Sequence, residues 1–133
     1  MNVWTKLLLH LRRAKLRQRF IRQWPDLFEA FKTALLAQNK DHPGRQWQDV
    51  EWITEPVLHV LPDTNIIPVA MVGIAAIYEL KDDDDNNSTQ TQAGTALFYF
   101  EQDTWQTQGK LLLNLSPSEA LLQLQRQTTS APA

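Results

Sequence analysis

The chain has 133 residues, of which 43% are hydrophobic, with 13 Lys and Arg against 15 Asp and Glu. A chain of this length builds one hydrophobic core, which excludes a two-domain enzyme. It contains no cysteine, which excludes disulfide frameworks, thiolate nucleophiles and cysteine-ligated metal sites and fits a reducing, cytoplasmic location.

The charges are distributed unevenly along the chain. Residues 1–24 contain seven basic residues and no acidic one, whereas residues 25–133 contain six basic and fifteen acidic residues. Such asymmetry indicates a basic arm that meets an acidic protein surface, an anionic membrane or a nucleic acid. The alternative is that the arm folds back onto its own acidic body.

The first expected element is a basic amphipathic helix over residues 1–24. Leu, Arg, Lys and Gln dominate this segment, and neither Gly nor Pro occurs before Pro25. Because Pro25 disfavours the α conformation of Trp24, we expect the helix to stop or kink there. Pro25 suits the first turn of a second helix, which we expect to end near Asn39.

The pattern changes to β after residues 42–44, His-Pro-Gly. Alternation between Val50 and Leu61 predicts one strand with a bulge, and the apolar run Ile66–Leu80 predicts a central strand. That run is shorter than the roughly 18 residues that a membrane-spanning helix needs. We therefore expect a cytoplasmic protein that is at most peripheral at a membrane surface.

Residues 82–95 are almost entirely polar, which predicts an acidic flexible loop between two strands. Asp82, Asp84 and Asn86 have the spacing with which a calcium-binding loop of the EF-hand type begins. The later positions that require Gly and Glu hold other residues, so we expect no metal site.

The C-terminal part predicts a hairpin followed by a short helix. Ala96–Phe100 and Trp105–Leu115 read as strands around a turn at residues 102–104. The sequence Ser-Pro-Ser-Glu from Ser116 to Glu119 is typical of a capped helix start. We expect this helix to run to about residue 127 and residues 128–133 to form a disordered tail.

Together these elements predict an α+β domain over residues 25–127, joined to the basic helix of residues 1–24. Two N-terminal helices would cover one face of a four-stranded antiparallel meander sheet, with a short C-terminal helix closing the domain. The shape is similar in outline to cystatin-like and nuclear-transport-factor-like domains. No motif of either family occurs, so this likeness carries no function.

The basic helix has two apolar stripes on nearly opposite sides. The first stripe consists of Trp4, Leu7, Leu8 and Leu11, and the second of Leu9, Leu16, Phe20 and Trp24. One core cannot bury both stripes without also burying cations, so we expect one stripe to stay exposed as a binding surface. The alternative is a helix that lies in a crease of the domain and uses both stripes.

These features predict a non-enzymatic accessory, assembly or regulatory factor that docks through its basic helix on the acidic surface of a larger protein complex. The first stripe would supply apolar contact, and the bases would supply orientation and association rate. The bases are Arg12, Arg13, Lys15, Arg17 and Arg19. An anionic membrane and a second copy of the helix are alternative partners, and nucleic acid is less favoured because the acidic body repels it.

Three tryptophans belong to the predicted sheet. Trp52 and Trp105 share their faces with apolar residues, which predicts core positions. Trp47 lies between two glutamines ahead of the first strand, so we expect it to be exposed as a further partner contact.

Catalytic chemistry has little support in the sequence. The histidines are far apart, and no phosphate-binding loop or nucleophile motif occurs. We therefore expect neither enzymatic activity nor a cofactor. The alternative is a ligand-binding or catalytic domain with a pocket between helices and sheet, for which His59, Glu51 and Tyr99 are the candidates.

Overall fold

The computed structural model describes residues 2–61, 66–81 and 87–129, which form an α+β fold. The elements in chain order are α1 (Val3–Ala37), the short 3₁₀ helix η1 (Gln38–Asp41), β1 (Arg45–Trp52), β2 (Val57–His59), β3 (Val69–Lys81), β4 (Asn87–Glu101), β5 (Thr104–Gln106), β6 (Leu111–Leu113) and α2 (Pro117–Thr129).

The antiparallel sheet is built on the long pair β3 and β4. Their register runs from Val69 opposite Tyr99 to Lys81 opposite Asn87. Strands β1 and β2 both pair with β3, and β5 and β6 both pair with β4. The prediction of a four-stranded meander was wrong, because the sheet has six strands. On each side of the β3–β4 pair, irregular backbone divides the outer strand into two, β1 and β2 on one side and β5 and β6 on the other.

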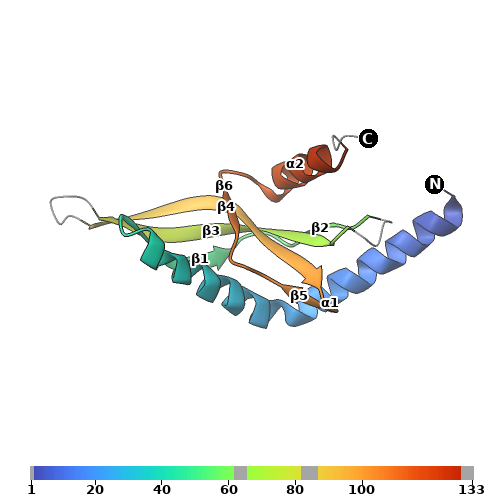
Figure 1. Cartoon of the computed structure of the whole chain (residues 1–133), viewed down its shortest axis with the longest axis horizontal. Helices are drawn as coiled ribbons and strands as arrows, with labels where there is room; N and C mark the ends of the chain where they lie inside the picture. Colours follow the sequence, from blue (N-terminus) through green and yellow to red (C-terminus); the bar gives the residue numbers. More distant parts are fainter. Residues whose placement is uncertain (1, 62–65, 82–86, 130–133) are drawn as a thin grey trace.

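The two helices lie on opposite faces of the sheet, with α1 below it and α2 above it in Figure 1. The core under α1 includes Phe31, Val72 and Phe98, whereas the smaller core under α2 includes Met71, Leu97 and Ala120. Alternate residues of β3 and β4 thus supply both cores. The prediction that helices cover only one face was wrong.

A single helix replaces the two predicted N-terminal helices, because Pro25 lies inside α1. Proline removes one helical hydrogen bond and clashes with the preceding turn, which costs about 3 kcal/mol. Buried side chains at helical spacing continue on both sides of it, including Phe20, Leu27 and Phe31. Their burial outweighs this cost, and Figure 1 shows the axis of α1 bending near its middle as it passes the sheet.

Strand β4 begins at Asn87, so most of the predicted loop over residues 82–95 is strand. The polar side chains from Ser88 to Thr91 are exposed, and backbone pairing with β3 orders this segment without their burial. The predicted loop was wrong for this part. Asp82, Asp84 and Asn86, whose spacing was considered for calcium binding, all lie outside the described residues.

The predicted helix cap is confirmed, and the turn predicted at residues 102–104 is found at Gln102 and Asp103, because Thr104 already belongs to β5. Gln102 and Asp103 both have positive φ, 54° and 61°, as a two-residue type I′ turn requires. At the start of α2 the Ser116 N–H donates to Glu119 Oε1 at 3.1 Å, and the Glu119 N–H donates to Ser116 Oγ at 3.2 Å. Helix α2 runs to Thr129, so the tail predicted from residue 128 begins too early, and residues 130–133 lie outside the described residues.

Candidate interaction site

The inward face of α1 fixes the helix to the sheet. Its buried residues are Leu16, Phe20, Leu27, Phe31 and Leu35. The Trp105 Nε1–H donates to the Leu16 carbonyl oxygen at 2.9 Å. Further along, Lys32 Nζ lies 2.7 Å from Asp49 Oδ1 of β1, and this hydrogen bond raises the pKa of Lys32 and lowers that of Asp49. This face is structural along most of the helix.

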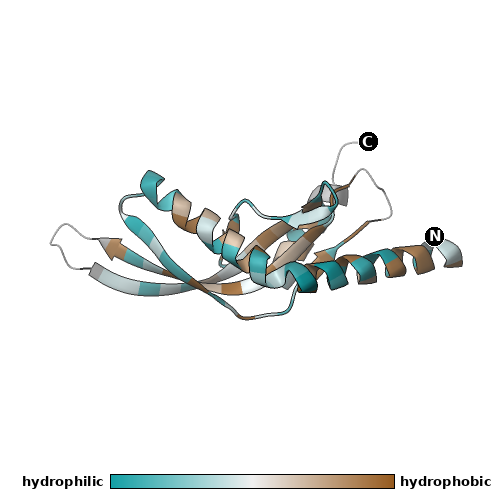
Figure 2. Ribbon diagram, turned by 90° about the horizontal axis from the view of Figure 1, so that it is seen from below, coloured by the Kyte–Doolittle hydropathy of each residue, from teal (hydrophilic) through white to brown (hydrophobic). Residues whose placement is uncertain are grey.

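The outward face of the same helix begins with the outer stripe, which we define as Trp4, Leu7, Leu8 and Leu11. All four side chains are exposed, Trp4 to 72% and Leu8 to 63%. At about 100° per residue, the stripe points almost opposite to Leu16 and Phe20. Figure 2 shows hydrophobic residues gathered at this projecting end of α1. The expectation that one apolar stripe stays exposed is met by the stripe nearest the N-terminus.

Three of the predicted partner-binding bases instead contact the body of the domain. Arg12 donates to the Leu61 carbonyl oxygen at 2.9 Å. Arg17 donates to the Pro56 carbonyl oxygen at 2.8 Å and pairs with Glu55 at 3.2 Å. For these residues the alternative of an arm that folds back on its own body describes the geometry.

Arg19 is held in the same way at the β4–β5 turn. Its guanidinium pairs with Asp103 at 3.0 Å and lies 5.1 Å from the centroid of the Phe100 ring. Because its carboxylate partner is largely exposed, this ion pair contributes little stability by itself. The pair connects α1 with the β4–β5 turn.

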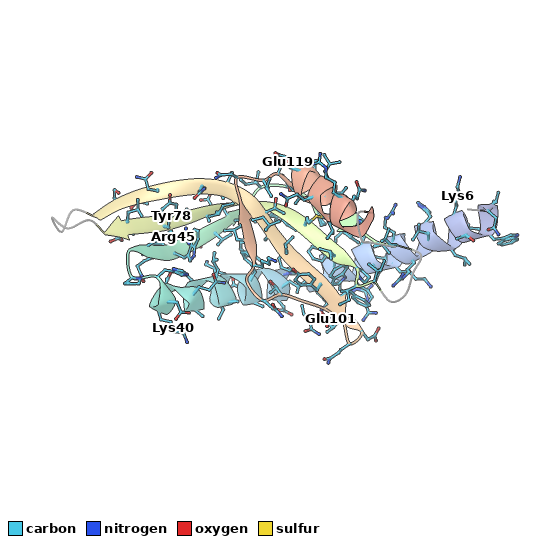
Figure 3. All side chains as sticks on the ribbon, turned by 45° about the horizontal axis from the view of Figure 1, so that its top comes forward. Lys6, Lys40, Arg45, Tyr78, Glu101 and Glu119 are labelled. Atoms are coloured by element: carbon cyan, nitrogen blue, oxygen red, sulfur yellow. The ribbon has the colours of Figure 1, made fainter. Side chains whose placement is uncertain are left out.

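The remaining bases of the helix form no ion pair with any residue described. They are Lys6, Arg13, Lys15 and Arg22. Lys15 lies four residues after Leu11 and Arg22 lies eleven residues after it, so both continue the outward face beyond the outer stripe. Figure 3 shows Lys6 on the projecting part of α1, away from the sheet. The outward face is therefore apolar first and then basic.

The predicted exposure of Trp47 was wrong, because Trp47 is only 4% exposed. A register shift in β1 between Trp47 and Asp49 marks a β-bulge, which places Trp47 on the same face as Val50. Its ring packs against Tyr78 at 5.4 Å and beneath the Arg45 guanidinium at 4.7 Å. Nothing in the sequence predicts a bulge at this position.

Of the other two tryptophans predicted in the core, one is buried and one is not. Trp105 is buried, as predicted. Trp52 was expected in the core but is 51% exposed. It lies on the α1 side, 5.1 Å from the Trp24 ring, at the end of an edge strand where one side of the indole remains open to solvent.

The candidates for a catalytic pocket do not converge. His59 lines a groove of about 510 Å³ with Arg13 and Leu121, whereas Tyr99 lines a different cavity of about 240 Å³. Val69 stands between them, since it pairs with His59 on one side and with Tyr99 on the other. Glu51 is exposed on β1. No acid–base pair forms among these three residues.

His59 gives the fold a dependence on pH. His59 is only 6% exposed, and its Nε2 has no hydrogen-bond partner among the described residues. Burial lowers the pKa of His59 from 6.5, and the charge of Arg13 lowers it further. As pH falls through 6.5, the unfolded chain binds a proton before the folded chain does, so stability decreases.

We expect His59→Gln to weaken this loss of stability on acidification. Urea unfolding at about pH 7.5 and about pH 5.5 measures it. His10→Gln, at an exposed position on α1, serves as the matched control and should keep the wild-type dependence. An unchanged pH dependence in His59→Gln would contradict the assignment.

No protein-family model, curated protein or solved structure matches this chain. Within residues 2–61, 66–81 and 87–129, no helix is long and apolar enough to cross a membrane. The same part of the chain contains no group of three or more His, Asp or Glu side chains placed to hold a metal ion.

Proposed function

We propose that this chain is a non-enzymatic interaction module, an accessory, assembly or regulatory factor that docks on a larger protein complex through the outward face of α1. The outer stripe enters an apolar groove of the partner. Lys15 and Arg22 meet an acidic rim beside that groove. Arg12, Arg17 and Arg19, which contact the body, hold the helix in place for docking.

The observation that carries this proposal is the exposure of the outer stripe on a helix whose opposite face is buried from Leu16 onward. Trp4, Leu7, Leu8 and Leu11 stand at positions i, i+3, i+4 and i+7, the spacing with which an amphipathic helix fills a hydrophobic groove. Large apolar patches exposed on a protein surface often mark interaction sites. Exposed Trp is also the residue type most often dominant in binding energy.

Charge favours a protein partner over a polyanion. Residues 25–133 contain nine more acidic than basic residues, which repels nucleic acid and anionic lipid alike. Of the seven bases in residues 1–24, the three arginines described above are occupied by the body. A local acidic rim matches the two bases on the outward face better than a continuous anionic surface does.

The test is capture of partners from native lysate with the intact chain and with the double variant Trp4→Ser, Leu8→Ser. We expect the double variant to lose a stoichiometric protein partner, with affinity reduced by at least about 30-fold, because two central apolar anchors are removed. Circular dichroism should be unchanged, since both side chains are exposed.

Leu122→Ser provides the matched control, because Leu122 is an exposed leucine on α2. It should retain the partner. Retention of the partner by the double variant would contradict the proposal. Flotation of the intact chain with phosphatidylserine vesicles, in the absence of a protein partner, would replace it with attachment to a membrane surface.

The basic part of the outward face has a separate test. Lys15→Glu combined with Arg22→Glu should slow association about tenfold or more at low salt and leave dissociation nearly unchanged, because these charges act mainly through steering. Lys40→Glu changes an exposed base on η1 and should have little effect. Surface plasmon resonance with the captured partner separates the two rates.

A further inference from the structure

A second surface lies at the far end of the molecule from the outer stripe, on the outer edge of β4. From Asn87 to Gln92 this strand pairs with β3 on one side only. Pairing on its other side begins at Ala93, whose carbonyl oxygen accepts from the Asn114 N–H at 3.1 Å, and continues along β6. Among the residues described, none hydrogen-bonds to the backbone of the edge before that point.

The hydrogen bonds on either side of this edge fix which residues face it. The Ala93 carbonyl oxygen and the Leu97 N–H both bond toward the β6 side, the latter to the Lys110 carbonyl oxygen at 3.1 Å. In an antiparallel strand, alternate residues direct both backbone groups to the same neighbour. Asn87, Thr89 and Thr91 therefore direct N–H and C=O groups to the edge, where no described residue pairs with them.

The other edges described are protected against pairing. Strand β1 contains a bulge and the charged residues Arg45, Asp49 and Glu51. Strands β2, β5 and β6 have three residues each. In contrast, residues 87–92 contain no charged residue, no proline and no glycine. Charges, bulges and short length are the usual devices that prevent a free edge from pairing.

We propose that this edge of β4 pairs with the same edge of a second copy of the chain. The strands run antiparallel about a twofold axis at Thr89. Asn87 of one copy then lies opposite Thr91 of the other, and Ser88 lies opposite Gln90. In this register every free N–H and C=O group of Asn87, Thr89 and Thr91 finds a partner.

The residues fit this self-pairing chemically. No like charges face each other, and the Thr89 pair on the axis is a favourable cross-strand pair. Figure 1 shows the paired ends of β3 and β4 reaching beyond both helices, which leaves room for a second sheet to approach. The interface is isologous, as expected for a twofold dimer. It is independent of the outer stripe, and a dimer would carry two copies of that stripe.

Light scattering of the intact chain over a range of concentration tests the proposal. We expect the mass to rise from 15.4 kDa toward twice that value. Thr89→Pro should weaken dimerisation by about 10- to 100-fold, because it removes an N–H that faces only the second copy. Thr89→Val keeps the backbone and should dimerise as the intact chain does.

Hydrogen exchange of the intact chain gives a second readout that does not depend on a variant. With rising concentration, the amides of Asn87, Thr89 and Thr91 should gain protection, whereas those of Ser88 and Gln90 should not change because they face β3. A monomer at every concentration up to the millimolar range would overturn the proposal. Dimerisation of a folded Thr89→Pro variant at the strength of the intact chain would also overturn it. The same holds if concentration protects amides elsewhere in the chain without the expected difference between alternate residues of β4.

Discussion

Phe20→Ala is expected to lower the free energy of unfolding by about 3–5 kcal/mol. Phe20 is 1% exposed and lies where α1 crosses the sheet. Its ring packs edge-on against Phe98 at 5.3 Å and Trp105 at 5.2 Å, and beside Trp24 at 5.4 Å. Truncation leaves a cavity that these large rings cannot close without moving α1.

Urea unfolding followed by tryptophan fluorescence measures this loss. Leu8→Ala on the same helix is the matched control, because Leu8 is exposed; it should change stability by less than about 0.5 kcal/mol. If Phe20→Ala cost less than about 1 kcal/mol, the aromatic cluster would not be the core of the contact between α1 and the sheet.

Gly109→Ala is expected to destabilise the fold by about 2–5 kcal/mol. Gly109 has a φ of 76°, in the left-handed region that favours glycine. A Cβ at this position would lie 2.8 Å from Ala34 Cβ and 2.9 Å from the backbone nitrogen of Leu35. The connection between β5 and β6 therefore passes against the backbone of α1, and an added methyl would push the two apart.

Gly44→Ala is the control for this second substitution. A Cβ at Gly44 would meet nothing within 4 Å, so its effect should stay within about 0.5 kcal/mol. Thermal unfolding of both variants by circular dichroism gives the comparison. Equal melting temperatures for Gly109→Ala and the unaltered chain would show that the close approach to α1 does not matter for stability.

Local sequence signals predicted the elements whose structure is decided locally. The cap at Ser116 and the turn at Gln102–Asp103 depend on neighbouring residues, and both are confirmed. The central strand follows from its continuous apolar run. Pro25 does not end the helix, because the burial of Phe20 and Leu27 on either side of it keeps α1 continuous, and of the two expected outcomes only a bend near the middle of the helix is observed.

The remaining errors of fold arise from contacts between distant segments. Polar residues such as Thr89 join β4 because β3 offers a long partner, and polarity alone predicts a loop there. The bulge in β1 turns Trp47 to the buried face of the sheet. The alternation of residue types in the sequence cannot reveal an extra residue in a strand. A bulge becomes visible only from the register against β3.

The candidate site was predictable in part. Helical geometry separated the outer stripe from the inward stripe correctly, because it depends only on angles within one helix. The contacts of Arg17 and Arg19 with Glu55 and Asp103 were not predictable, since these residues are far apart in the sequence. Composition alone cannot distinguish the bases that contact the body of the domain from those proposed to contact a partner.

We propose that the two faces of α1 have separate roles, one holding the fold and one left for a partner. Deletion of residues 2–8 tests it most directly, because it removes Trp4, Leu7 and Leu8 but keeps Leu9, which packs against the core. A longer deletion through residue 24 would also remove the buried Leu16 and Phe20 and confuse the two roles.

The measurement is a comparison of the deleted and intact chains by urea unfolding and by capture from native lysate. We predict a chain that remains folded, with a loss of stability below about 1 kcal/mol, and that no longer captures its stoichiometric protein partner. A deleted chain that unfolds, or one that is stable and still captures the same partner, would contradict the account.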